Sequence, residues 1–317
     1  MLEGLFAERT AALTDGHEQG SRRAAVEQFG QRRELVGWLP AVPVTAGLLL
    51  QDEPVDVVGQ GAGRAQRQLG PGLDDGTRDK KLANILAKRF RVVRLHRRQY
   101  RLDLKADPKL GSPCTIAEEV QDVLAVVRAI GGPVVLYGHS DGGVVALEAL
   151  AASPSSFAGG VISEPAAVIG PPLSGEGGEV LKQARAALAA GRPGKAMAIF
   201  SRGASGLPPW QASLVGLIVA VVPKYRRLIP CQLDSLDALD QLAVRLDTYA
   251  MIEVPSVLLG GGSKRNPAHI RKRLDAIQRV MPHAERVVMP KRDHGADLKA
   301  PKEVARVIET LADKVLH

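Results

Sequence analysis

Aromatic residues are scarce in this sequence, at 3% of the chain, so a core built from it must be mainly aliphatic. Cysteine is scarce as well. Cys114 and Cys231 stand far apart, which excludes a disulfide framework and the close ligand spacing of a structural metal site. No basic head with a long apolar run opens the sequence, and the longest apolar run, Leu214–Val222, is too short to span a bilayer. We therefore expect a cytoplasmic protein without a membrane partner.

Positive charge is in excess, with a formal net charge of +8. The excess is concentrated between Lys80 and Lys105. Nucleic-acid binding would need stacking aromatic residues or a known reader motif within such a patch, and only Phe90 and Tyr100 lie nearby. We therefore interpret the basic side chains as solvated faces of a helix and a loop, and we expect no nucleic-acid partner.

The strongest local pattern is a Gly-x-Ser-x-Gly motif at Gly138, Ser140 and Gly142. The aliphatic run Val134–Leu136 precedes it, and the apolar helical run Val144–Ala152 follows it. Such a motif between a strand and a helix is typical of a nucleophile elbow, in which larger side chains at the two glycines would collide. The start of the helix directs its dipole and its free N–H groups at the serine. The pattern predicts a nucleophilic serine.

Strand and helix patterns alternate along most of the chain. The predicted strands are 42–50, 54–58, 91–95, 160–163, 254–259 and 286–289, and the predicted helices are 81–90, 115–130, 267–281 and 302–315. Thr115 is a suitable N-cap, and Gly131 a suitable helix end. Residues 64–68 are too polar for a central strand. The alternation predicts a parallel sheet with helices on both faces.

The alternation stops between residues 170 and 247, where helical patterns follow one another. An all-helical insert in an α/β chain is typical of a cap over a site. We therefore predict a core of residues 41–169 and 248–317 and a helical cap of residues 170–247. Residues 1–40 carry no chemical motif and form an N-terminal extension, either helical or poorly ordered.

Further segments accompany the elbow: Phe90–Val93, Arg97-Arg98, Ser163–Pro165, Val254–Ser263 and Val287–Gly295. Together with the elbow, they resemble the α/β-hydrolase superfamily over roughly residues 42–317. The resemblance implies the α/β-hydrolase fold, a mostly parallel sheet with helices on both faces and a helical cap insert. Members of the superfamily are mostly esterases, lipases and related hydrolases of acyl bonds. Their serine, acid and histidine follow in that chain order.

By this resemblance Ser140 is the nucleophile and His294 is the base. A serine hydroxyl is a poor nucleophile near neutral pH and needs an adjacent base. His294 follows the last predicted strand, on a polar loop where the family keeps its base. The other histidines fit less well. In particular, His139 is expected to point away from the site because of its place in the elbow.

The acid of the triad has two interpretations. The family usually places it in the turn after the strand at 257–259, but Gly260–Lys264 contains no carboxylate. Some members take the acid from the end of the preceding strand, where this chain has Glu164. A Glu-Pro pair at this position is also common in relatives that keep the usual acid. Glu164 is therefore either the catalytic acid or a structural or substrate-facing residue.

The oxyanion hole should consist of the backbone N–H of Asp141 and one N–H from an early glycine-rich loop. Two loops compete for the second donor. Gln60–Gly63 follows a credible strand, and Gly70–Leu73 has the family's spacing to Phe90. We favour Leu73.

Two hypotheses about function follow. The first is a serine esterase that cleaves a small, apolar carboxylic ester or a similar acyl substrate through an acyl-enzyme, with no cofactor and no metal. The second is a catalytically impaired relative that binds a small apolar ligand beneath the cap. Three features motivate it: the missing acid, the weak early strands, and the turn at 95–101, where Gln99 and Arg101 replace residues that permit a positive φ. The apolar cap residues Leu214, Leu217 and Ile218 serve either the packing of the cap or contact with an acyl chain, and we favour packing.

Overall fold

The computed structural model describes residues 48–50, 53–58, 65–69, 77–100, 113–132 and 134–316. The predicted extension, residues 1–40, and Leu73 lie outside the described residues. The strands are β1 (Leu48–Leu50), β2 (Glu53–Val58), β3 (Ala65–Leu69), β4 (Arg91–Leu95), β5 (Val134–His139), β6 (Phe157–Ser163), β7 (Ser256–Gly261) and β8 (Glu285–Met289). The α-helices are α2 (Lys80–Leu86), α3 (Ile116–Ile130), α4 (Asp141–Ala152), α5 (Glu179–Ala189), α6 (Pro193–Gly203), α7 (Pro209–Val221), α8 (Pro223–Leu242), α9 (Leu246–Ala250), α10 (Ala268–Val280), α11 (Ala296–Lys299) and α12 (Pro301–Val315).

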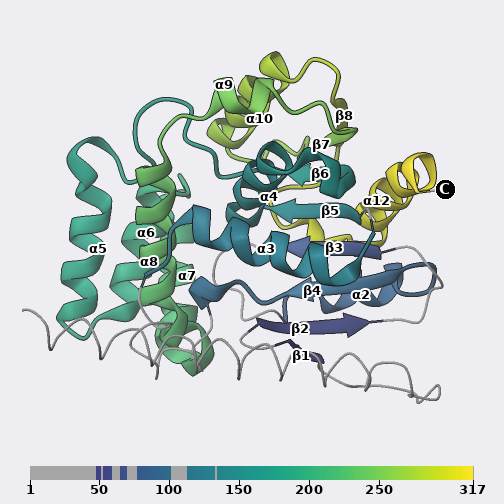
Figure 1. Ribbon diagram of the computed structural model, residues 1–317. Coiled ribbons are helices and arrows are strands. Elements are labelled where there is room, and N and C mark those ends of the chain that lie inside the picture. The colour runs from purple at the N-terminus through teal and green to yellow at the C-terminus, as the bar shows by residue number, and fades with distance from the viewer. Residues whose placement is uncertain are drawn as a thin grey trace, which may run out of the picture. The chain divides into compact units, whose positions relative to one another are not determined.

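The described strands form one sheet in the order β1-β2-β4-β3-β5-β6-β7-β8 (Figure 1). The pairs β1/β2 and β2/β4 are antiparallel, and every other pair is parallel. The predicted strands at 91–95, 160–163, 254–259 and 286–289 correspond to β4, β6, β7 and β8. The predicted parallel sheet is therefore confirmed, with an antiparallel edge at β1 and β2.

The polar segment around residue 66 is a central strand, so the prediction against a strand at 64–68 is wrong. The backbone of β3 pairs in parallel with β4 on one side and with β5 on the other. Ala65 aligns with Arg91 and with Val134, and the pairing continues to Leu69. Whether a segment forms a strand depends also on the neighbouring strands that pair with its backbone. Hydrophobic pattern does not show this pairing, and three consecutive polar residues in this segment do not indicate a strand.

Helices cover both faces of the sheet. Along β5 the side chains alternate: Val134 and Leu136 join a core cluster with α3, α4 and α10, whereas Val135 and Tyr137 join a second cluster with α2 and α12. Figure 1 shows α3 crossing in front of the strands. Both clusters consist mainly of Val, Leu, Ile and Ala, as the low aromatic content predicts.

Helix α3 begins and ends where its sequence predicts. Thr115 is the N-cap, and its side chain accepts a hydrogen bond from the N–H of Glu118 while the Glu118 carboxylate accepts one from the N–H of Thr115. This reciprocal capping box satisfies two N–H groups that the first helical turn leaves free. At the other end Gly131 adopts φ 77°, a left-handed conformation that glycine adopts without a steric penalty.

The basic segment after β4 is not wholly a solvated face, so this part of the charge interpretation is wrong. The Arg97 guanidinium is buried and donates two hydrogen bonds to Glu119 on α3. Arg98 pairs with Asp122, one turn further along the same helix. A buried arginine of this kind is held in place by paired hydrogen bonds to a carboxylate.

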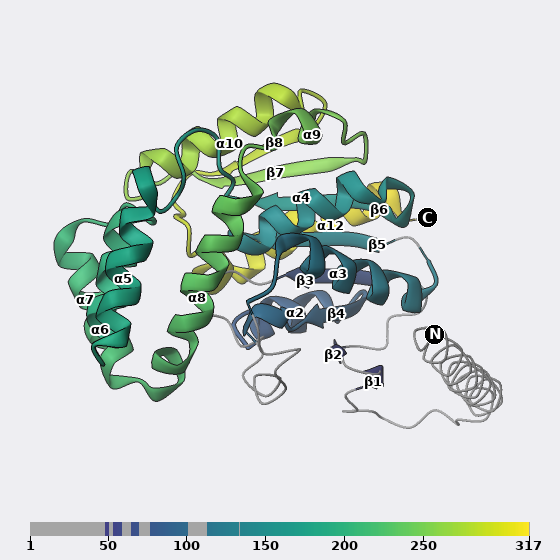
Figure 2. The ribbon, with the colours of Figure 1, turned by 60° about the vertical axis from the view of Figure 1, so that its left-hand side comes forward.

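Helices α5 to α8 lie between β6 and β7 in the sequence and form a helical insert. Figure 2 shows these helices side by side. They have their own apolar cluster, which includes Leu181, Met197 and Leu233. Helices α6 and α7 approach each other closely at Gly194 and Gly216. A Cβ atom at Gly194 would lie 2.6 Å from the carbonyl oxygen of Gly216, so neither position accommodates a larger residue without movement.

The apolar residues that were expected to pack the insert face outward. Leu214, Leu217 and Ile218 on α7 are 50%, 61% and 43% exposed. They are absent from the insert's buried cluster and from the lining of the cavity described below. Helical spacing alone cannot tell which face of an almost entirely apolar helix is buried, and this explains the error. Among the described residues, no helix combines the length and apolar character needed to cross a membrane.

Candidate active site

Ser140 occupies the sharp turn between β5 and α4. Its backbone has φ 56° and ψ −120°, a conformation that L-residues rarely adopt and that neighbouring structure must maintain. The Ser140 N–H donates to the carbonyl of Ser163, and the N–H of Ala166 donates to the carbonyl of Ser140. A Cβ atom at Gly138 would lie 2.4 Å from the carbonyl oxygen of Gly142. The motif therefore builds the tight elbow that its sequence predicts.

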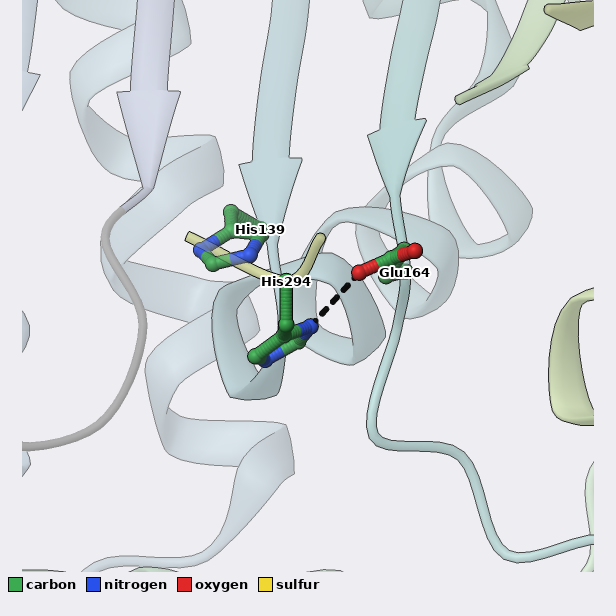
Figure 3. A group of neighbouring side chains, drawn as sticks. All are labelled: His139, Glu164 and His294. Atoms are coloured by element: carbon green, nitrogen blue, oxygen red, sulfur yellow. Dashed lines mark hydrogen bonds and ion pairs between the residues drawn. The ribbon is translucent and has the colours of Figure 1, made fainter. Parts of the chain in front are cut away.

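A chain of hydrogen bonds connects Glu164, His294 and Ser140. Nδ1 of His294 lies 2.8 Å from Oε2 of Glu164, and Nε2 lies 3.1 Å from Oγ of Ser140 (Figure 3 shows the first contact). A carboxylate only accepts hydrogen bonds, so Nδ1 carries the proton and donates a hydrogen bond to Glu164. The lone pair of Nε2 then faces the Ser140 hydroxyl. The structure thus brings together the three side chains predicted to form the triad.

Each of these side chains follows a strand of the parallel part of the sheet. Ser140 follows β5, Glu164 follows β6, and His294 lies on the loop after β8. The carboxyl ends of parallel strands lie at one edge of the sheet, and sites in open α/β folds form at that edge. Parallel pairing of β5 with β6, β6 with β7 and β7 with β8 therefore positions the site.

The Glu164 carboxylate is almost fully buried and satisfied by donors. Its Oε1 accepts hydrogen bonds from the N–H of Gly261, at 2.7 Å, and from the side-chain amide of Asn266, at 2.5 Å. Burial raises the pKa of Glu164, but the hydrogen bond from His294 and those from Gly261 and Asn266 outweigh it, so the pKa lies below its ordinary value. Glu164 is therefore ionised at neutral pH. Its φ of 42° is a second left-handed conformation of a non-glycine residue at the site.

The turn after β7 holds the acid in place, although it contains no carboxylate. Gly261 lies at its start, and a Cβ atom there would lie 2.5 Å from the carbonyl oxygen of Arg292 on the loop of His294. Asn266 completes the turn by donating both to Glu164 and to the carbonyl of Gly261. The sequence interpretation missed Asn266, since an asparagine after glycines and a serine resembles any other turn residue.

His139 lies against His294, so the expectation that it points away from the site is wrong. The ring centroids of His139 and His294 are 4.5 Å apart (Figure 3). Alternation along β5 places His139 on the same face of the sheet as Tyr137, and the loop of His294 crosses that end of the strand. Burial lowers the pKa of His139 to about 4, although Asp297, 3.9 Å from Nδ1, opposes the shift. His139 is therefore neutral near pH 7.

Asp141 follows the serine and forms the first residue of α4. The first N–H groups of a helix have no partner within the helix, so its backbone N–H is available as an oxyanion donor. Its buried carboxylate accepts hydrogen bonds from Ser235, at 3.0 Å, and from Tyr100, at 3.3 Å, and it lies 3.9 Å from Arg97. Ser235 belongs to α8, so this network connects the elbow to the helical insert. The other predicted donor, Leu73, lies outside the described residues.

A cavity of about 560 Å³ opens above the elbow. Ser140, His139 and His294 line its floor, and side chains of the insert and of α10 line its walls. The apolar part of the wall includes Leu173, Met197, Phe200, Leu207, Val215 and Leu236. A volume in this range accommodates a small organic molecule.

His139, Glu164 and His294 also form the one group among the described residues with the spacing of a metal site. Their potential ligand atoms lie within 4.8 Å of one another. Two of these groups, Glu164 and His294, are already hydrogen-bonded to each other, and the remaining nitrogen of His294 faces a serine hydroxyl. Two histidines and one carboxylate match the donor set of a zinc site, but the ring of His294 serves the serine in the observed orientation.

The fold and the site define a class of protein. A serine at a strand-to-helix elbow, with a histidine and a carboxylate at the same edge of a mostly parallel sheet, is the arrangement of the α/β hydrolases. The chain belongs to the alpha/beta hydrolase family, whose model matches residues 71–307. The predicted superfamily and fold class are therefore confirmed. A comparison with curated protein sequences gives no match.

Several solved structures share this fold. An alpha/beta hydrolase from Sphaerobacter thermophilus DSM 20745 is 24% identical, with a TM-score of 0.66, and the match covers 82% of this chain and 96% of that one. The enol-lactonase from Burkholderia xenovorans LB400 is 17% identical, with a TM-score of 0.60 and coverage of 83% and 98%. An esterase from Rhodococcus sp. ECU1013 is 17% identical, with a TM-score of 0.58 and coverage of 83% and 95%.

Proposed function

We propose that this hydrolase is a serine hydrolase that cleaves a carboxylic ester or a similar acyl substrate through an acyl-enzyme. The observation that carries the proposal is the pair of contacts made by His294, at 3.1 Å to Ser140 and 2.8 Å to Glu164. A nucleophile within reach of a base that a third group orients is the arrangement needed to activate a serine.

The proposed reaction has two halves. Ser140 Oγ attacks the substrate carbonyl while Nε2 of His294 takes its proton, and the positive imidazole ring is stabilised by the ionised Glu164. The N–H of Asp141 stabilises the negative oxygen of the tetrahedral intermediate. The tetrahedral intermediate then collapses, the bond to the leaving oxygen breaks, and His294 gives its proton to that oxygen so that the alcohol departs. In the second half, His294 takes a proton from water, the resulting hydroxide attacks the acyl-enzyme, and Ser140 recovers its proton as the acid leaves.

The named activities of similar structures support an acyl substrate. They include an esterase, an enol-lactonase and a thioesterase domain from the curacin biosynthetic pathway. All three names describe hydrolysis at an acyl carbon bonded to oxygen or sulfur. We propose the same bond type for this chain, and we propose that the helical insert acts as the cap that encloses the acyl group, because its side chains line the cavity above Ser140.

The competing hypothesis is an impaired relative that only binds a ligand, and one of its motives is the missing carboxylate in the turn after β7. The contact between Glu164 and His294 supports the hydrolase instead, because it offers an orienting carboxylate from the end of β6. The buried position of Glu164 and its donors from Gly261 and Asn266 further support a fixed orientation of the acid.

Labelling with a fluorophosphonate tests the proposal, because this probe reacts with an activated serine hydroxyl and requires no knowledge of the substrate. We expect stoichiometric labelling of the protein and loss of labelling in Ser140→Ala. A folded protein that the probe does not label would overturn the proposal and leave the binding hypothesis. Labelling that persists in Ser140→Ala would assign the nucleophile to another residue.

A further inference from the structure

Several cationic side chains line the cavity, and the proposed mechanism uses none of them; one of them differs from the rest in its surroundings. Arg273 lies on α10 and lines the same cavity as Ser140 and His294. Its side chain is half-buried. No hydrogen bond or ion pair joins its guanidinium to any residue that the structure describes.

The other cations of the lining are either neutralised or solvated. Arg78 donates to Asp297 at 2.6 Å, and Lys299 pairs with Asp293 at 2.7 Å. Arg265 is exposed. Within the described part of the chain, Arg273 is thus the cation of this cavity that is both sheltered from solvent and without a partner.

The carboxylates of the lining are engaged elsewhere. Glu164 is hydrogen-bonded to His294, and Asp293 accepts a hydrogen bond from Lys299. Asp141 accepts hydrogen bonds from Ser235 and Tyr100, and its charge acts on Arg273 only from a distance.

Asp240 also lies in the neighbourhood of Arg273, but it accepts hydrogen bonds from the N–H groups of Leu173 and Ser174. Burial lowers the pKa of Arg273, and the charges of Asp141 and Asp240 offset this only in part. Arginine stays protonated through any such shift at neutral pH, so the cavity holds a fixed positive charge.

An unpaired, partly desolvated charge raises the free energy of the folded protein, and a bound ligand group of opposite charge lowers it again. We propose that Arg273 binds a carboxylate of the substrate, so that the enzyme prefers acyl esters that carry a second, acidic group. The inference rests on the proposed hydrolase function and replaces the expected apolar ester with an acidic one.

The chemistry of the subsite favours a carboxylate over a phosphate. A guanidinium presents a planar pair of N–H donors that matches the two oxygens of a carboxylate. A phosphate ester carries a larger charge, which favours a site with a second cation. Arg78 and Lys299 already have carboxylate partners, so they fit this role less well. The apolar wall formed by residues such as Met197 and Phe200 suits the short hydrocarbon chain between the ester and the acid group.

Matched esters measure the preference. The substrates are the monomethyl esters of succinate, glutarate and adipate, each compared with its dimethyl ester, in which the acid is masked. The readout is the ratio of kcat/KM for the monomethyl ester to that for the dimethyl ester. We expect the wild type to prefer the monomethyl ester of at least one chain length. We expect the ratio to fall by about 10- to 100-fold in Arg273→Gln, the range for loss of a hydrogen-bonded charge pair.

Two further variants distinguish a direct contact of Arg273 with the carboxylate from a general effect of positive charge. Arg273→Lys keeps the charge but loses the planar pair of donors, so it should retain part of the preference. Lys272→Gln removes a charge from the exposed side of the same helix and should leave the ratio unchanged. An unchanged ratio in Arg273→Gln would overturn the inference, as would an equal fall in Lys272→Gln.

A binding measurement separates this inference from the proposed function. Ser140→Ala cannot turn over the ester, and ligand-observed NMR detects weak binding of monomethyl glutarate to it. We expect binding to weaken at least about 10-fold in the double variant Ser140→Ala with Arg273→Gln. Absence of binding to Ser140→Ala, or equal binding to both variants, would overturn the carboxylate subsite whether or not the wild type is labelled by a fluorophosphonate.

Discussion

Glu164 determines which nitrogen of His294 carries the proton. The carboxylate accepts from Nδ1 at 2.8 Å, which leaves Nε2 free to take the serine proton. Its depressed pKa keeps it charged at neutral pH, so in the proposed mechanism it also stabilises the imidazolium that forms on His294. In the proposed mechanism, one buried side chain thus fixes the tautomer of His294 and stabilises its protonated form.

The variant Glu164→Gln separates these roles from simple packing. Glutamine keeps an oxygen for the donors of Gly261 and Asn266, but its NH₂ group cannot accept from Nδ1 and favours the wrong tautomer. We expect kcat to fall by about 10³- to 10⁴-fold with little change in KM, as for loss of the orienting carboxylate in serine proteases. Steady-state kinetics with a methyl ester give both values. Glu253→Gln, an exposed carboxylate, is the control, and a similar loss there would contradict the assignment.

Local sequence patterns predict some residues of the site and not others. The elbow predicts Ser140 because its glycines and its flanking strand and helix are local, and the loop after the last strand predicts His294. Asn266 and the place of His139 depend on which loops cross at the strand ends. That information lies in the tertiary structure, so no local pattern carries it.

Helix α8 is the element that connects the insert to the elbow. Its residue Ser235 donates to the buried carboxylate of Asp141, and Gln99 next to Tyr100 donates to the backbone carbonyl of Cys231. Leu228 and Cys231 of α8 pack with Tyr100 in a small apolar cluster. The insert is therefore attached through the residue whose backbone N–H is the proposed oxyanion donor.

Ser235→Ala removes one hydrogen bond to this buried carboxylate. We expect the free energy of unfolding to fall by about 1.5–3 kcal/mol, the range for a hydrogen bond to a charged group. Urea unfolding of the variant and the wild type measures the difference. Ser213→Ala, on the exposed face of α7, should change stability by less than about 0.5 kcal/mol. Equal effects of the two substitutions would show that the Ser235 contact does not anchor α8.

At the scale of elements, hydrophobic pattern predicted most strands and helices of the core. It failed at β3, where polar residues occupy a strand that is paired on both sides, and at α7, where nearly every side chain is apolar and no face stands out. The charge pattern predicted a solvated Arg97, because a sequence does not show that Glu119 lies opposite it on α3. The errors at α7 and Arg97 concern contacts between elements, whereas the error at β3 concerns the existence of a strand that is paired on both sides.

The stability of the whole molecule should fall in mild acid. The pKa of His139 is lowered to about 4 by burial, against 6.5 in the unfolded chain. Between these values the unfolded state binds the proton more tightly, so stability is fully present above pH 6.5 and is lost as the pH falls towards 4. The pKa of the half-buried His269 is lowered to about 4 as well, chiefly by burial, and adds to the same trend.

The variant His139→Phe isolates the share of His139 in this loss. From the two pKa values, wild-type stability should lose about 2 kcal/mol more between pH 7.5 and pH 5 than the variant loses. Urea unfolding at both pH values provides the comparison, with the pH dependence, not the absolute stability, as the readout. The same pH dependence in both proteins would mean that His139 is not held neutral in the fold.

In the proposed function, the fold activates one serine, Ser140. The most direct measurement is the site and stoichiometry of fluorophosphonate labelling, determined by intact mass and by mapping of the labelled peptide. We predict one adduct per chain on Ser140, none in Ser140→Ala, and full labelling in Ser205→Ala, which alters another serine of the cavity lining. A folded, unlabelled wild type, or an adduct on any other residue, would contradict the assignment of Ser140 as the nucleophile.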